Sequence, residues 1–151
     1  MRLHIVLVEP EIHWNTGNLG RTALAVGATL HLVEPLGFEL DDKHLLRAGL
    51  DYWPRVKWRR WPGWDEFARA LPSLGQAWYF SARATRPYWD ADFRGETVLI
   101  FGRESVGLPA ALIDEAGDHA LCIPMKDPAL RSLNLSTAGA LAAYEVLRQR
   151  G

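Results

Sequence analysis

Residues 123–146 read IPMKDPALRSLNLSTAGALAAYEV, and the rest of the sequence can be organised around this stretch. It starts as the end of an apolar strand, continues as a loop with two prolines, and becomes a helix rich in small residues. Asn134 or Ser132 can cap the first turn, which leaves free N–H groups at the positive end of the helix dipole, while Arg148 and Arg150 complement the other end. The pattern indicates a loop that holds a ligand against a helix start. An ordinary capped helix on a core is the alternative.

Apolar runs bounded by turn residues alternate with helical patterns along the whole chain. The predicted strands are 3–8, 29–33, 55–59, 76–81, 97–101 and 119–123. The predicted helices lie near 16–27, 42–48, 64–71, 109–115 and 134–149. Nearly continuous apolar runs, such as TVLIF at 97–101, are typical of strands covered on both faces. The sequence therefore predicts an α/β fold with a parallel-sheet core and helices on both faces. Its 151 residues suit a single domain, 1–151.

Composition limits the range of functions. The net charge is −1, so binding to nucleic acid would depend on local basic patches or on a dimer that combines them. The single cysteine, Cys122, lies in an apolar run, which excludes an internal disulfide and indicates a buried thiol in a reducing cytoplasm. No run is long enough for a membrane span or a signal sequence, so a soluble cytoplasmic protein is expected. The five histidines show no paired metal spacing, so no metal is expected.

The stretch 52–64 interleaves four tryptophans with four basic residues. Flat rings and cations in this arrangement could stack on bases and contact phosphates. The other interpretation is a partly buried surface strand with solvated basic ends, and this interpretation is favoured.

The predicted parallel sheet directs attention to the carboxyl ends of its strands, where such folds bind ligands. After the first strand, Asn15 and Thr16 could cap a helix that contains Gly17 and Gly20. Glycines cost about 1 kcal/mol each inside a helix, which indicates a close approach by a neighbour. After the strand 97–101, the glycine spacing matches neither a dinucleotide fingerprint nor a phosphate loop.

Five segments in order resemble the SPOUT methyltransferases, specifically the small tRNA 2'-O-methyltransferases that modify the wobble nucleotide. The segments are PEIHWNTGNLGR at 10–21, EPLGF at 34–38, RAGLDY at 47–52, FGRESVGLP at 101–109, and SLNLS at 132–136 followed by an alanine-rich helix ending in Tyr144-Glu145. The resemblance runs nearly end to end. Arg103 and Val106 depart from it, because the family usually has proline at the first position and often a basic residue at the second.

The resemblance implies a deep C-terminal trefoil knot, a homodimer, and methyl transfer from S-adenosylmethionine to the ribose 2'-hydroxyl of a wobble cytidine or uridine in tRNA. It implies that one subunit's 10–21 segment lies near the other subunit's cofactor. The implied cofactor-binding residues are Phe80, Gly102, Glu104, Ile123, Met125, Ser132 and Leu133. The implied substrate-binding residues are Asn15, Asn134 and Tyr144.

Arg21 is the catalytic residue that the resemblance implies. A guanidinium gives up its proton only with great difficulty, so a role in orienting phosphate and stabilising a developing alkoxide is favoured over a role as base. The alternative for Arg21 is an ordinary surface arginine. The small residues Ala138, Gly139, Ala142 and Ala143 of the last helix are expected to pack against a second subunit, or else inside one subunit.

Two other functions are compatible with the sequence. One is 2'-O-methylation of ribosomal RNA. The other is a non-catalytic RNA- or nucleotide-binding α/β module, which Arg103 and the near-neutral charge favour. The presence of Arg21, Glu104 and Asn134 speaks against that module.

Overall fold

The computed structural model describes residues 1–41, 43 and 50–151. The helix predicted near 42–48, and residues 47–49 of the 47–52 segment, lie outside the described residues apart from residue 43. The strands are β1 Leu3–Val8, β2 Thr29–Val33, β3 Trp58–Trp61, β4 Gln76–Phe80, β5 Arg86–Pro87, β6 Thr97–Phe101 and β7 Ala120–Cys122. The α-helices are α1 His13–Val26, α3 Trp64–Leu74, α4 Ala110–Ala116 and α5 Leu135–Arg150. Short 3₁₀ helices cover Trp53–Arg55, Tyr88–Asp90 and Gly117–His119.

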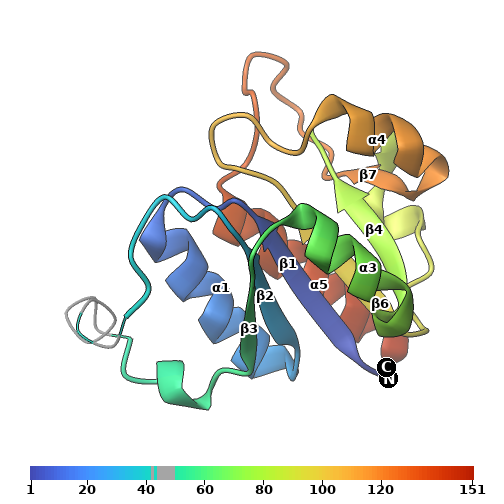
Figure 1. The fold of residues 1–151 in the computed structure, drawn as a ribbon. Helices are drawn as coiled ribbons and strands as arrows, with labels where there is room; N and C mark the ends of the chain where they lie inside the picture. The colour runs from blue at the N-terminus through green and yellow to red at the C-terminus, as the bar shows by residue number, and fades with distance from the viewer. Residues whose placement is uncertain (42, 44–49) are drawn as a thin grey trace.

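The seven strands of the described residues form one sheet in the order β3-β2-β1-β6-β4-β7-β5, and every pair in it is parallel. Figure 1 shows the helices on the two faces of this sheet. The predicted α/β class and parallel core are therefore confirmed. β5 was not predicted, because two residues are too few for a periodic signal.

Alternation along β1 explains why helices cover both faces. Ile5 and Leu7 belong to the core cluster that contains buried residues of α1 and α5. Val6 and Val8 belong to the second cluster, which includes residues of α3 and α4. Successive side chains of a strand point to opposite faces, so an entirely apolar strand needs a helix layer on each side.

Helices α1 and α5 pack closely on one face of the sheet. A Cβ atom at Gly139 would lie 2.3 Å from the Leu19 side chain, and Ala142 and Ala143 are fully buried. The small residues of α5 therefore allow α1 of the same chain to pack closely against it. The expectation that this face contacts a second subunit is wrong, because α1 already covers it.

The helix starts differ in how they are capped. The Asn134 side chain accepts hydrogen bonds from the N–H groups of Ser136 and Thr137, so the predicted cap of α5 is confirmed. Helix α1 begins at His13, earlier than predicted. Asn15 and Thr16 therefore lie inside the helix, buried, and the prediction that they cap it is wrong.

Most of the stretch 52–64 belongs to the fold itself. Trp53 and Trp61 are buried, the Arg59 guanidinium stacks 3.8 Å from the centre of the Trp61 ring, and Arg60 pairs with Glu34 at 2.9 Å. The favoured interpretation, a partly buried strand with basic ends, matches β3 at the edge of the sheet. Pairing with β2 moves this strand from the predicted 55–59 to Trp58–Trp61.

A polar chain lies buried beneath α3. The Trp61 Nε1–H donates to His31 Nδ1 at 3.0 Å, and His31 Nε2 lies 2.9 Å from His4 Nδ1. Because indole is only a donor, His31 must accept at Nδ1 and donate from Nε2 to His4. The remaining donor, His4 Nε2–H, is buried without a partner among the described residues. Both rings are therefore neutral in this arrangement, and burial is the main reason that the pKa of His31 is lowered to about 3.

Candidate active site at the carboxyl ends of the strands

The loops that follow β1 and β6, and the start of α5, meet at the carboxyl end of the sheet (Figure 1). β1 and β6 are parallel neighbours, so residues 9–12 and 102–108 leave the sheet at the same end. β6, β4 and β7 are also neighbours, as expected if the loops after these three strands share one site.

Glu104 joins the β6 loop to the start of α1. Its carboxylate accepts hydrogen bonds from the backbone N–H groups of Glu11 and Ile12 at 2.8 and 2.9 Å, and from Asn15 Nδ2 at 3.2 Å. The N-cap residue Ile12 offers no side-chain cap, so Glu104 supplies a negative charge and acceptors at the positive end of α1. The contact of Glu104 with the cofactor stays a prediction. In the structure, the Glu104 carboxylate holds the β6 loop against the start of α1.

Asn15 connects the same network to α5. Its Oδ1 accepts a hydrogen bond from Asn134 Nδ2 at 3.1 Å, while Asn134 Oδ1 caps α5. Two predicted substrate-binding residues, Asn15 and Asn134, therefore touch one another and, through Glu104, the β6 loop. The resemblance identified the three residues separately, and the fold brings them together.

Glu11 takes part in the network although no role was predicted for it. Its carboxylate accepts the Ser105 N–H at 2.8 Å and lies 3.7 Å from the Arg103 guanidinium. These contacts, with the Ser105 backbone N–H as the largest cause, lower the pKa of the Glu11 carboxyl. Hydrogen bonds therefore run in both directions between the two loops, since Glu11 also donates its own N–H to Glu104. An acid at the end of a strand was visible in the sequence, but its partner was not.

Gly102 is required by the β6 loop itself. A Cβ atom there would lie 2.2 Å from the backbone of both Gly107 and Leu108, because the loop folds back with a 2.8 Å hydrogen bond from Gly107 N to Arg103 O. Gly107 has a φ of 71°, a region that favours glycine. A substitution at Gly102 would therefore reshape the loop whether or not a cofactor lies nearby.

The other predicted cofactor-binding residues differ in exposure. Phe80 is buried and stacks on Phe101 with 4.6 Å between ring centres. Ile123, Met125 and Leu133 are half-buried, and Ser132 is exposed. The half-buried side chains all lie in the segment 123–134, which connects β7 to α5.

Arg21 and Tyr144 are not part of this network. The Arg21 guanidinium lies 5.5 Å from the centre of the Tyr52 ring, and Tyr52 donates its hydroxyl hydrogen bond to the Gly17 carbonyl at 2.7 Å. Tyr144 is exposed on α5. Arg21 and Tyr144 are both exposed, and within the described residues neither side chain contacts Glu104, Asn15 or Asn134.

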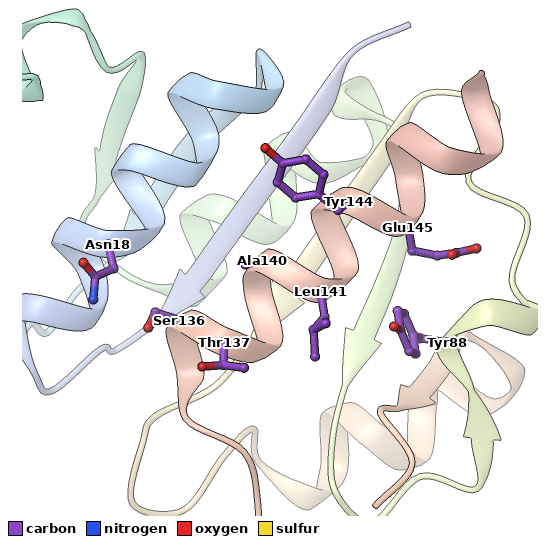
Figure 2. Close-up of a pocket in the computed structure, with 8 residues that line it drawn as sticks. All are labelled: Asn18, Tyr88, Ser136, Thr137, Ala140, Leu141, Tyr144 and Glu145. Carbon is purple, nitrogen blue, oxygen red and sulfur yellow. The ribbon is translucent and has the colours of Figure 1, made fainter.

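A pocket of about 630 Å³ lies on the outer face of α1 and α5. Figure 2 shows Asn18 on α1 on one side of it and residues of α5, among them Tyr144, along its length. Its lining consists of Asn18, Tyr88, Ser136, Thr137, Ala140, Leu141, Tyr144 and Glu145. Tyr144 is the one predicted site residue that lines it.

Several general features bear on the site. Within the described part of the chain, no three or more His, Cys, Asp and Glu side chains form a group that could hold a metal ion. None of the helices in that part is both long and apolar enough to cross a membrane. Cys122 is a free thiol and only half-buried, so it is less buried than predicted, and desolvation raises its pKa.

The fold and the joined loops define a class of α/β proteins that includes solved RNA methyltransferases. A model of the SpoU rRNA Methylase family matches residues 2–144, and the chain belongs to this family. The family predicted from the five segments is thereby confirmed.

Individual relatives agree with this assignment. The tRNA (cytidine(34)-2'-O)-methyltransferase of Acidovorax sp. (strain JS42) is 45% identical over 148 residues, which cover 97% of this chain and 91% of the relative. A solved structure described as giving structural insights into the 2-OH methylation of C/U34 on tRNA has a TM-score of 0.89, 47% identity, and coverage of 98% and 90%. The SpoU methyltransferase AviRb from Streptomyces viridochromogenes, in complex with AdoMet, has a TM-score of 0.84 and 26% identity, over 99% of this chain and 58% of that one.

Proposed function

We propose that the protein is an S-adenosylmethionine-dependent methyltransferase that modifies the ribose 2'-hydroxyl of the wobble cytidine or uridine in tRNA. The observation that carries the proposal is the contact between Glu104, Asn15 and Asn134, which joins three family segments at the carboxyl end of the sheet. Relatives of this activity match the chain over nearly its full length. A protein that modifies tRNA would act in the cytoplasm.

The loop residues suit a cofactor with an apolar ring and a charged amino-acid portion. Ile123, Met125 and Leu133 offer half-buried apolar surface for the adenine, and Ser132 offers an exposed hydroxyl. Phe80 is the last residue of β4 and Gly102 directly follows β6, so both would line the floor of the same region. When bound, S-adenosylmethionine supplies an activated methyl group.

The chain's own contribution to the reaction is orientation and charge. As a cationic donor, Arg21 would hold a phosphate and stabilise negative charge on the 2'-oxygen. Asn15, Asn134 and Tyr144 would position the nucleotide. Since Arg21 lies outside the network of its own chain, it would serve the site of a second subunit.

The proposed homodimer uses the outer face of α1 and α5. Leu141, Tyr144 and Leu147 are exposed there, and the pocket that Asn18 and α5 line lies on the same face. This face replaces the small-residue face in the earlier expectation. A sedimentation measurement at micromolar concentration should give a dimer.

The C-terminal trefoil knot is part of the proposal. The path that supports it runs from β7, near one edge of the sheet, through residues 123–134 and back to α5 against α1. Such threading is rare among proteins in general.

The deciding experiment is incubation with labelled S-adenosylmethionine and total bacterial RNA, followed by mapping of the labelled nucleotide. Label at the 2'-hydroxyl of position 34 in tRNA is the expected result. Label in ribosomal RNA would establish the alternative that the family's description as rRNA methylases favours. Binding without any transfer would indicate a non-catalytic module.

A further inference from the structure

The chain carries 17 lysines and arginines against 18 acidic residues, so its affinity for a polyanion depends on which cations remain without a partner. Many are engaged. Arg2, Arg60, Arg94 and Arg148 pair with carboxylates. Arg150 donates to the carbonyls of Met1, Arg2, Phe93 and Gly95. Cations whose donors are already used within the chain in this way are less available to RNA phosphates.

Three other cations form a contrasting set. Arg83 lies in the loop after β4, and Lys126 and Arg131 lie in the segment after β7. All three side chains are exposed, and within the described residues they form no ion pair or hydrogen bond. β4 and β7 are parallel neighbours, so both segments leave the sheet at the carboxyl end. We call Arg83, Lys126 and Arg131 the carboxyl-end cations.

Four carboxylates near this end of the sheet already accept hydrogen bonds or face an arginine. Glu104 accepts N–H groups from α1, and Glu11 accepts Ser105 N–H and faces Arg103. Glu9 lies 3.9 Å from Arg103, and Asp127 accepts the Ala129 N–H at 2.8 Å. These four acids are held by backbone groups and by Arg103, and none of them pairs with a carboxyl-end cation, which leaves those cations available to phosphate.

The stretch 52–64 is the rival surface. Its two buried tryptophans, the stacking of Arg59 on Trp61 and the pairing of Arg60 with Glu34 use most of its aromatic and basic groups internally. Arg55 and Lys57 remain exposed and without a partner in the described part of the chain. The segment 53–57 precedes β3, so it lies toward the opposite, amino end of the sheet, at the bottom of Figure 1.

We infer that the carboxyl-end cations Arg83, Lys126 and Arg131 form the surface on which the tRNA phosphate backbone docks, and that the stretch 52–64 does not. The inference rests on the proposed function and extends it by assigning the RNA surface. Docking at this end would place the tRNA backbone beside Ser132 and Asn134, where the loops meet. Phosphate contacts of this kind fix the register of a nucleic acid on its protein.

The test compares two triple variants that remove the same charge. One is Arg83→Gln/Lys126→Gln/Arg131→Gln. The matched control is Arg55→Gln/Lys57→Gln/Arg69→Gln, in which Arg69 is a third exposed cation without a partner in the described residues, on α3. Fluorescence anisotropy with labelled unfractionated bacterial tRNA gives Kd for wild type and both variants between about 50 and 200 mM salt.

Each lost phosphate contact reduces the slope of log Kd against log salt by about 0.7 to 0.9. For the carboxyl-end variant, the slope of log Kd against log salt should therefore fall by about two, and Kd at low salt should rise at least tenfold. The control should keep the slope of the wild type. Thermal unfolding of each variant shows that the fold is intact, since exposed cations contribute little to stability.

Two results would overturn the inference. In one, the control loses slope and the carboxyl-end variant keeps it, which would assign RNA binding to the control cations Arg55, Lys57 and Arg69. In the other, both triples lose slope equally, which would mean that net charge alone attracts tRNA. Wild-type protein that neither binds tRNA nor transfers a methyl group would instead refute the proposed function.

Discussion

Two polar networks in this molecule are built in opposite ways. Trp61, His31 and His4 form a buried chain of neutral donors and acceptors beneath α3. Glu104, Asn15 and Asn134 form a network at the carboxyl end of the sheet, and its centre is an ionised carboxylate held by the N–H groups of α1. The first network depends on histidine rings that are neutral. The second depends on a carboxylate that accepts hydrogen bonds with both of its oxygens.

The difference separates stability from function. A neutral buried chain stabilises the fold only while its rings are unprotonated. A carboxylate at a helix start fixes the position of one loop relative to another, which is what a site assembled from three segments needs. Changes in the buried chain should therefore alter the free energy of unfolding first, and changes near the carboxyl end should alter methyl transfer as well.

Arg21→Ala should give the largest effect on activity. Loss of a donor that stabilises developing charge typically costs about 3–4 kcal/mol, so methyl transfer should fall by a factor of about 100 or more. Stability should hardly change, because Arg21 is exposed and its stacking on Tyr52 contributes about 1 kcal/mol at most. Single-turnover kinetics with tRNA measures the first quantity and urea unfolding the second.

Arg21→Lys distinguishes charge from geometry. Substantial rescue would indicate simple electrostatics, whereas failure would indicate that the planar fork is needed. An unchanged single-turnover rate in Arg21→Ala would make Arg21 an ordinary surface arginine.

Gly102→Ala should destabilise the protein by about 3 kcal/mol, because the new Cβ would overlap the backbone of Gly107 and Leu108. Gly95→Ala is the matched control, since a Cβ there meets nothing within 4 Å. Chemical unfolding measures both free energies, and calorimetry with S-adenosylmethionine measures the effect on the cofactor site. Equal stability of the two variants would contradict the close packing of the β6 loop.

Acidification should weaken the fold through His31. The folded pKa is lowered to about 3 from 6.5, so the unfolded chain binds the proton more tightly and stability falls as the pH drops from about 6.5 toward 3. The slope approaches 1.4 kcal/mol per pH unit, which gives a loss of about 2–3 kcal/mol by pH 4.5. His4, whose pKa is also lowered, adds to the loss.

Urea unfolding between pH 7.5 and 4.5 tests this dependence. That window lies mostly above the range in which carboxylates with a lowered pKa, such as Glu11, begin to contribute. A free energy of unfolding that stays constant across the window would mean that the buried rings accept protons without cost.

Glu104→Gln should cost about 2 kcal/mol of stability, because neutralising the acceptor weakens charged hydrogen bonds to α1 and turns an NH₂ group toward N–H donors. Glu96→Gln is the control. Glu96 also accepts a backbone N–H, from Arg2, but its side chain is largely exposed, so Glu96→Gln should cost clearly less stability than Glu104→Gln. Similar losses in both variants would mean that the carboxyl-end network has no special role in joining the loops.

The resemblance supplied the residues of the candidate site, which stay a prediction, and local patterns identified much of the fold. The apolar runs at 3–8, 29–33 and 97–101 are strands with those bounds, since continuous burial on two faces leaves an unmistakable pattern. The Asn134 cap was predictable because capping is local. The start of α1 was not, because its acceptor, Glu104, comes from a distant part of the chain.

By itself, the sequence determined the α/β class, the family and the small residues that let α5 be approached closely, because these depend on local composition and order. The tertiary structure decided which neighbour approaches: Leu19 of the same chain lies against Gly139. It also decided that Gly102 packs against the backbone of Gly107 and Leu108 in its own loop. In the stretch 52–64, it decided that Arg59 stacks on a ring and Arg60 pairs with an acid. Contacts between residues far apart in the chain depend on the packing of whole elements, and no local pattern encodes them.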